Sequence, residues 1–170
     1  MSIVNTSEYL ESDLEQVLAG SINVATYPKI LQILGLGSCI AVCFYNSDQK
    51  LGAMAHVMLP SHRNALTPSL VGKYADTAIK ALLELFQKKK IKKKDIVVKI
   101  IGASSMFSRN RVSFDISERN LIAVEEEITK FNLKIESKDV GGSKGRTIYF
   151  HLNDGRVEVF YAGGKYKTTI

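Results

Sequence analysis

Two long apolar runs in the first third of the chain predict a pair of buried strands. One continues from Leu34 through residues 40–45 (IAVCFY), and the other covers residues 52–60 (GAMAHVMLP). Residues 46–50 (NSDQK), which link them, are rich in turn formers, so we expect the two strands to form a hairpin. Residues 30–34 are too apolar to leave one face in water, which indicates a strand covered on both faces.

Apolar residues recur at spacings of three and four in two later stretches. They predict one amphipathic helix between Ser69 and Lys90 and a second that ends near Asn132, with Ser117 as its N-cap. Because the strands do not alternate regularly with the helices, we expect an α+β fold with both helices packed on mixed β-sheet layers. The other predicted elements are a short helix from Ser7, a strand at 17–25 that pairs with the segment after Pro28, a strand at 95–101, a loop at 103–115, and strands at 134–138, 147–152 and 157–161.

A chain of 170 residues is long enough to bury a core of its own. We therefore expect one domain over residues 1–170, with loose termini at 1–15 and 163–170. The N-terminal residues lack the basic and then apolar order of a signal peptide, and no apolar run approaches the roughly 18 residues of a membrane span. These features favour a cytoplasmic protein without direct membrane insertion.

The net charge of +6 is concentrated in one place, because residues 88–94 alone contain six lysines. A nucleic-acid site would spread arginine and aromatic residues around such a patch, and this run has neither, so we expect no nucleic-acid partner. A solvated helix end is the simpler interpretation. Weak electrostatic steering toward an acidic partner is the functional alternative.

The predicted hairpin also carries candidate chemistry. Cys39 opens the first strand and His56 lies in the second, so a thiol nucleophile and its base can meet across the pair. The glycines around Leu36 allow positive φ and close backbone approach, which would leave N–H groups at Gly37 and Ser38 free to form an oxyanion hole. A neighbouring imidazole would lower the thiol pKa from its free value of about 8.5. The alternative is an ordinary core cysteine beside a hydrogen-bonded core histidine.

Other polar residues give weaker signals. Cys43 lies on the same strand face as Cys39 at about 13 Å, too far for a disulfide or a shared metal, so we expect a core residue, no metal site and no cofactor. The glycine-rich residues 141–146 lack phosphate-loop spacing and favour a turn. The loop after the His56 strand contains three candidates for substrate contact, His62, Arg63 and Asn64. For His62, an exposed side chain without a catalytic role is the simpler interpretation.

Four ordered blocks over residues 16–160 resemble the signature of the CheD family of chemoreceptor glutamine deamidases. They are GLGSCIAVCFY with GAMAHVMLP, IGASSMF, ISERNLIAVEEEI and DVGGSKGRTIYFHLNDGRVEV. The resemblance implies an α/β/α sandwich and a cysteine hydrolase in which Cys39 attacks a glutamine carboxamide and His56 moves the protons. It also implies glutamines on cytoplasmic chemoreceptor helices as the substrate and a CheC-type phosphatase as a partner.

The chain departs from the family pattern at one position. The family has a threonine six residues before the cysteine, which orients the histidine, and Ile33 stands there in this chain. An isoleucine side chain cannot hydrogen-bond an imidazole. Either Gln32, Asn64 or a backbone carbonyl orients His56, or the site is weak, in which case Ile33→Thr should raise turnover. The second hypothesis is a CheD-like adaptor that binds receptor or phosphatase and catalyses little. An unrelated thiol acyltransferase is a third.

Overall fold

The computed structural model describes residues 9–63, 65, 70–105, 111–164 and 166–170, and the side chains of 111–115 are excepted. Its strands form two five-stranded mixed sheets. The β3 sheet has the order β1 (Leu14–Gln16), β3 (Ile30–Leu36), β8 (Arg146–His151), β9 (Val157–Tyr161) and β10 (Lys167–Thr169). The β4 sheet has the order β2 (Ile22–Thr26), β5 (Leu51–Val57), β4 (Ile40–Asn46), β6 (Val97–Gly102) and β7 (Ile135–Val140).

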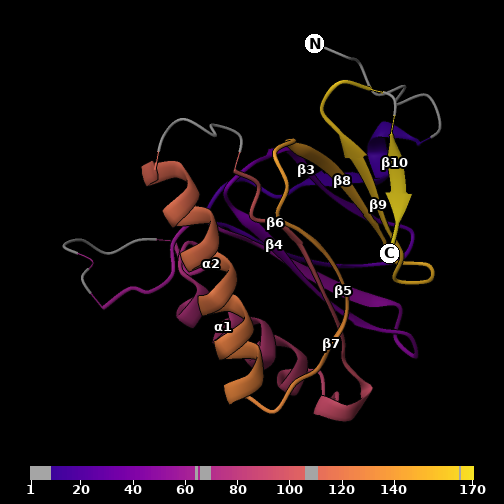
Figure 1. Cartoon of the computed structure of the whole chain (residues 1–170). Helices are drawn as coiled ribbons and strands as arrows, with labels where there is room; N and C mark the ends of the chain where they lie inside the picture. Colours follow the sequence, from indigo (N-terminus) through magenta and orange to yellow (C-terminus); the bar gives the residue numbers. More distant parts are fainter. Residues whose placement is uncertain (1–8, 64, 66–69, 106–110, 165) are drawn as a thin grey trace.

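Two helices, α1 (Ala75–Lys88) and α2 (Arg111–Lys130), cover the outer face of the β4 sheet (Figure 1). Leu82 and Phe86 of α1 and Val124 of α2 share one buried cluster with alternate residues of β4, β5 and β6. The predicted α+β fold with two helices on mixed sheet layers is therefore confirmed. The expected α/β/α order is not what the described residues form, since both helices lie on the same side and the β3 sheet covers the other.

A second core fills the space between the two sheets. Ala41, Cys43 and Met54 of the β4 sheet pack there against residues such as Ile33 and Ile148 of the β3 sheet. Every residue of β4 and β5 is buried, because one face of these strands meets the helices and the other meets the second sheet. This two-sided cover explains why their sequences are continuously apolar instead of alternating.

The predicted hairpin forms, with β4 antiparallel to β5 and Ile40 opposite Val57. The apolar strand before it belongs elsewhere, because β3 pairs with β8 in the other sheet. Residues 37–39 carry the chain from one sheet to the other, so Cys39 precedes β4 and does not open a strand that is continuous with Leu34. Similarly, β2 pairs with β5, so the expected pairing of residues 17–25 with the segment after Pro28 is wrong.

Several element ends also differ from the predictions. The first helix begins at Ala75, six residues after the predicted start at Ser69. The second begins at Arg111, which places Ser117 inside the helix with a buried side chain instead of at the N-cap. Residues 14, 15 and 167–169, expected in loose termini, lie in the edge strands β1 (Leu14–Gln16) and β10 (Lys167–Thr169). The start of the short helix predicted from Ser7 lies outside the described residues, and η2 (Glu11–Asp13) is a single 3-10 turn.

The two sheets meet at two ends of the sandwich, the nucleophile end, called after the predicted nucleophile Cys39, and the far end. At the nucleophile end, Leu36 and Arg146 of the β3 sheet lie near Ile40 and Gly102 of the β4 sheet. At the far end, the hydroxyl of Tyr45 in β4 donates to the carbonyl of Leu152 just beyond β8, at 3.2 Å. The lysines of residues 88–94 follow α1 and extend into η3 (Lys93–Asp95), which leads into the far end of β6. All six lysines are exposed, as expected for a solvated helix end.

Candidate functional site

Residues 37–39, which we call the nucleophile loop after the predicted nucleophile Cys39, lie where the chain passes between the sheets. Just before it, Gly35 has φ of 72° at a bulge in β3 between Ile33 and Leu36, so the predicted positive φ is confirmed there. Gly37 does not have a positive φ. Cys39 is half-buried and packs against the core between the sheets. Its thiol therefore lies at the edge of that core and keeps partial access to solvent.

His56 faces the same inter-sheet layer. It lies opposite Ala41 in the ladder of β4 and β5, and directly opposite residues of an antiparallel pair point to one face. Its side chain shares this face with Met54 and is 8% exposed. Cys39 is two residues before Ala41, so it is a diagonal neighbour of His56, which in a regular ladder corresponds to about 7–8 Å between Cα atoms. The structure records no hydrogen bond between the thiol and the imidazole.

The ring of His56 is held on one side only. Burial lowers its pKa, and a hydrogen bond with the backbone of Val17 acts in the opposite direction. A bond that favours the charged imidazole is one that the ring donates, so the acceptor is the Val17 carbonyl. Nδ1 of His56 is buried and has no hydrogen-bond partner in the described part of the chain. The imidazole thus interacts with the Val17 backbone, while its Nδ1 has no partner in the described residues and can accept a proton.

Val17 is itself fixed to β3. Its N–H donates to the carbonyl of Gln32 at 2.8 Å, and its side chain is buried in the core between the sheets. Backbone bonds around His56 add to this support, because its N–H donates to the Ser21 carbonyl at 3.0 Å and its carbonyl accepts from the Gly20 N–H at 2.9 Å. The segment from Val17 to Ser21 therefore holds the histidine from outside its own hairpin.

Burial raises the pKa of the Cys39 thiol, while a hydrogen bond with the Ser38 side chain lowers it by less. With the pKa of His56 lowered and that of Cys39 raised, both groups are neutral near pH 7 in this structure. The thiol pKa is therefore raised, where the sequence led us to expect that the neighbouring imidazole lowers it. Cys43 is fully buried, and burial raises the pKa of its thiol strongly, which fits the predicted core residue.

All three carbonyls of the nucleophile loop are bonded toward the protein. Gly37 O accepts from Ser104 N at 2.9 Å, Ser38 O from Asn120 Nδ2 at 3.2 Å and Cys39 O from Ala103 N at 2.9 Å. In a trans peptide the C=O and the following N–H point in opposite directions. Fixing the carbonyls of residues 37 and 38 inward therefore turns the N–H groups of Ser38 and Cys39 outward. No acceptor for these two N–H groups occurs among the residues that the structure describes.

The end of β6 is shaped to receive this loop. A Cβ on Gly102 would lie 2.2 Å from the carbonyl oxygen of Cys39, so only glycine allows the approach. Ala103 then adopts a φ of 53°, unusual for a residue with a side chain. Ser104 is fully buried, and its hydroxyl is bonded to Lys144 O at 2.7 Å and to the Arg146 guanidinium. Strain and burial concentrate here because a tight backbone contact fixes the loop.

Sequence reasoning missed the side chains that support this loop. Asn120 is buried in α2, and Arg146 is buried at the start of β8, where its Nη2 lies 2.7 Å from Asp139 Oδ1. These residues fall in the blocks ISERN and GGSKGR that carry the family resemblance, which was the available signal. Their partners are backbone carbonyls and side chains distant in sequence, so residue type alone does not reveal their role.

Residues 61–63 of the predicted substrate loop line a groove. His62 is exposed, and its Nδ1 lies 2.8 Å from Asp76 Oδ2 at the start of α1. A groove of about 480 Å³ runs between residues 60–63 and the two helices, with Arg63, Lys80 and Glu126 among its lining residues. Neither Cys39 nor His56 lines it. Asn64 lies outside the described residues.

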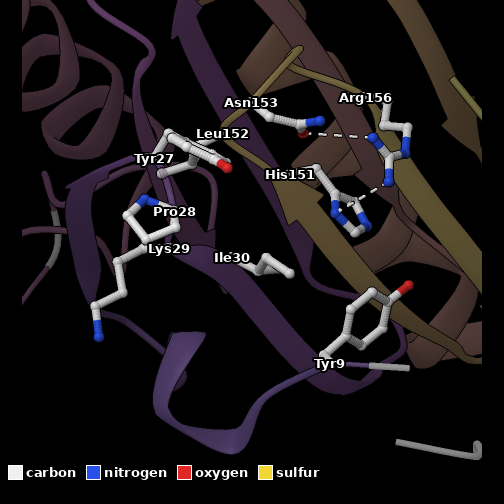
Figure 2. Close-up of a pocket in the computed structure, with 9 residues that line it drawn as sticks. All are labelled: Tyr9, Tyr27, Pro28, Lys29, Ile30, His151, Leu152, Asn153 and Arg156. Atoms are coloured by element: carbon white, nitrogen blue, oxygen red, sulfur yellow. Dashed lines mark hydrogen bonds between the residues drawn. The ribbon is translucent and has the colours of Figure 1, made fainter. Parts of the chain in front are cut away.

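A second concavity, of about 200 Å³, lies at the far end of the sandwich (Figure 2). Figure 2 shows His151 and Arg156 on one side of it and Tyr27 with Pro28 on another. Nε2 of His151 lies 3.1 Å from Glu158 Oε2, and its Nδ1 lies 3.3 Å from an Arg156 nitrogen. This histidine has partners on both ring nitrogens, unlike His56.

No group of three or more histidine, cysteine, aspartate or glutamate side chains suited to a metal ion occurs in the described ranges. Both cysteines are free thiols. Neither α1 nor α2 is long and apolar enough to cross a bilayer, as far as the described residues extend.

Comparisons with known proteins identify the family to which the chain is similar. The sequence model of the family described as CheD chemotactic sensory transduction matches residues 58–160. A "Probable chemoreceptor glutamine deamidase CheD" of Methanococcus maripaludis strain C6 is 41% identical over 153 residues, 90% of this chain and 97% of the relative. The protein of that name from Clostridium novyi is 38% identical over 156 residues, 91% of this chain and 96% of the relative.

A "Chemoreceptor glutamine deamidase CheD" of Thermotoga maritima is 38% identical over 145 residues, 85% of this chain and 90% of the relative. Matches of this length span the nucleophile loop, β5 and α2 in each case. The similarity therefore extends over the elements that form the candidate site, and over nearly the whole length of each relative.

Proposed function

Because the chain belongs to the CheD family, we propose that it is a protein-glutamine deamidase of chemoreceptors, with Cys39 as the nucleophile and His56 as the base. The observation that carries this proposal is the environment of His56. The Val17 backbone acts on the ring, and Nδ1 is buried without a partner in the described residues, beside the inter-sheet core against which Cys39 also packs. A histidine that served only the core would have both nitrogens bonded.

In the first half of the reaction, Nδ1 of His56 takes the thiol proton and the sulfur attacks the carboxamide carbon of a glutamine side chain. The oxygen of that carboxamide becomes an oxyanion, which the N–H groups of Ser38 and Cys39 stabilise. The imidazolium then gives its proton to the departing nitrogen, which leaves as ammonia. The product of this half is a thioester between Cys39 and the substrate.

In the second half, water attacks the thioester carbon while His56 accepts a proton from it. The same two N–H groups stabilise the second oxyanion. Collapse of this intermediate expels the sulfur, which recovers its proton from the imidazolium. The substrate leaves as glutamate, and one water has been consumed for each ammonia released.

The Val17 carbonyl takes the orienting role that the resemblance gives to a threonine at position 33. Ile33 is buried between the sheets and offers no hydrogen bond. The bond from Val17 N to Gln32 O connects this carbonyl to β3, so the strand still supports the histidine through its backbone. The site is thus built differently from the pattern and is not left without an orienting group.

The substrate in this proposal is a glutamine on the cytoplasmic helices of a chemoreceptor, and the reaction takes place in the cytoplasm. The groove beside His62 and Arg63 supports a role for this loop in holding the receptor helix, since it begins two residues after Met58 at the end of the His56 strand. A CheC-type phosphatase is the further partner that the family resemblance implies.

The test is mass spectrometry of receptor cytoplasmic fragments incubated with the protein. Each converted glutamine gains about one dalton, because NH₂ is replaced by OH. Cys39→Ala should abolish this mass change. Cys43→Ala is the matched control, four residues along the chain, and should retain most of the change. Equal loss in both variants, with both folded, would contradict Cys39 as the nucleophile.

The second candidate function is a CheD-like adaptor with little catalysis, which Ile33 favours because it removes the family's orienting hydroxyl. The same experiment separates the two functions. If the protein is an adaptor, wild type and Cys39→Ala should bind the receptor fragment with equal affinity. Neither protein should then change the mass of the fragment.

A further inference from the structure

One buried side chain of α2 connects the nucleophile loop to the strand that carries His56. The amide nitrogen of Asn120 donates to Ser38 O at 3.2 Å and to Met58 O at 2.9 Å. Ser38 immediately precedes the nucleophile, and Met58 follows His56 by two residues. Asn120 is 0% exposed, so these bonds are shielded from competing water.

The orientation of this amide is set by its partners. Both atoms that contact it are carbonyl oxygens, which accept only, so the nitrogen and not the oxygen of the amide must face them. Oδ1 of Asn120 has no partner within the part of the chain described by the structure. The position of the side chain therefore depends on its two donated bonds.

The bond to Ser38 fixes more than a carbonyl. Ser38 O and the N–H of Cys39 belong to one planar peptide unit and point in opposite directions. Holding the oxygen against α2 keeps the Cys39 N–H directed away from α2, toward the side where an oxyanion would form. The Ser38 N–H is directed in the same way, because the backbone N–H of Ser104 donates to Gly37 O, which belongs to the same peptide unit as the Ser38 N–H.

We propose that Asn120 is a positioning residue that aims the Cys39 N–H at the oxyanion and holds the nucleophile loop against the His56 strand. This inference rests on the proposed thioester chemistry. An oxyanion exists only in the tetrahedral intermediates and their transition states, so loss of this positioning lowers kcat and leaves KM nearly unchanged. A residue that only stabilised the fold would not separate the two constants.

The experiment compares two reactions of the same thiol. p-Nitrophenyl acetate acylates a thiolate through an oxyanion and expels p-nitrophenolate, whereas iodoacetamide alkylates it by displacement of iodide at carbon, with no oxyanion. Both rates are proportional to the thiolate fraction, so their ratio cancels any change in that fraction. Rates measured with Cys39→Ala are subtracted to remove reaction at other groups.

In Asn120→Asp the side chain keeps its shape, and its ionised form has no donor, so we expect the ratio of acylation to alkylation to fall about 30-fold. This is less than the roughly 10²–10³-fold cost of losing a whole oxyanion donor, because the Cys39 N–H remains present. Asn120→Ala removes the donors without adding charge and should lower the ratio to a similar extent, which covers the case in which the aspartate variant does not fold.

Asn46→Asp is the matched control. Asn46 is also buried and its amide nitrogen also donates to a backbone carbonyl, Asp95 O at 3.0 Å, but it lies at the far end of β4. It should leave the ratio unchanged. An unchanged ratio in folded Asn120 variants, or an equal fall in Asn46→Asp, overturns the inference. If wild type leaves receptor glutamines unchanged while the ratio still falls in Asn120→Asp, the proposed function fails and the positioning role of Asn120 stands.

Discussion

The two buried histidines of this sandwich lie at opposite ends and are held in different ways. His151, at the far end, is 4% exposed and contacts Glu158 through one ring nitrogen and Arg156 through the other. Glu158 also accepts a hydrogen bond from the Tyr9 hydroxyl and lies 3.5 Å from Lys167 Nζ. His56, at the nucleophile end, has one backbone partner and an unpaired Nδ1 among the described residues.

Burial alone does not distinguish these residues, since it lowers the pKa of both. The difference lies in what remains unsatisfied. An unpaired buried nitrogen costs free energy of folding, on the order of 1–3 kcal/mol, and a site persists with that cost where the nitrogen has a chemical use. The far-end histidine connects strands, whereas the other is available to a thiol on the same face.

Replacing each histidine by glutamine gives the largest expected effects. His56→Gln still provides a donor for the Val17 carbonyl but cannot act as the base, so turnover should fall by about 10²–10⁴ with little loss of stability. His151→Gln breaks a buried hydrogen-bonded pair and should cost about 1–3 kcal/mol of unfolding free energy with turnover unchanged. Turnover by mass spectrometry and urea unfolding of both variants check this. Equal effects of the two substitutions on turnover would remove the distinction.

The pH dependence separates the two histidines a second way. The pKa of His56 lies below the ordinary 6.5, and only the neutral ring can take the thiol proton, so kcat/KM should rise with pH through that lowered pKa. The pKa of His151 is also lowered, by burial first and then by Arg156, so below pH 6.5 the unfolded chain binds more protons and stability falls. His151→Gln should flatten this loss of stability and leave the acidic limb of the activity profile in place.

The fold was predictable where the signal is local. The hairpin of β4 and β5 and the apolar stripes of both helices follow from periodicity and are found, although both helices begin away from their predicted starts. The sheet to which β3 belongs was not predictable. It pairs with β8, more than a hundred residues later, and an apolar strand can pair equally well with β8 or with β4. Ser117 was placed at an N-cap because a polar residue before an apolar stripe has the same local signature as one buried inside a helix.

The candidate site also has a part that was predictable from the sequence and a part that was not. Cys39 and His56 were proposed from residue type and position in the hairpin, because thiol and imidazole chemistry is visible in a sequence. The groups around them are the carbonyl of Val17, the backbone of Ala103 and the amide of Asn120. Every residue has a carbonyl and an N–H, so no sequence pattern marks the ones that tertiary structure places beside a reactive side chain.

Ile33→Thr tests what orients the base, with a smaller expected effect. Sequence alone predicted a gain in turnover, whereas the bond from His56 to Val17 leaves little for a new hydroxyl to add, so we expect a change below about threefold. Because Ile33 is 1% exposed, the buried hydroxyl should cost about 1–3 kcal/mol of stability. Single-turnover rates and urea unfolding provide the measurement. A rise of tenfold or more would show that the Val17 carbonyl does not hold the ring adequately.

The smallest effect is expected from the lysines at residues 88–94, which follow α1 toward the far end of the sandwich. Lys88, Lys92 and Lys94 are exposed and are suited to a triple replacement by glutamine, whereas Lys93 is retained because its Nζ donates to the Phe131 carbonyl at 2.9 Å. If the patch steers an acidic partner, kcat/KM for receptor fragments should fall about two- to threefold at 10 mM salt, where the screening length is about 30 Å. The difference should vanish at about 1 M salt, where that length is about 3 Å, and kcat should stay constant throughout. A fall in kcat itself would mean that the far end participates in turnover, and the contrast between the two ends would then be wrong.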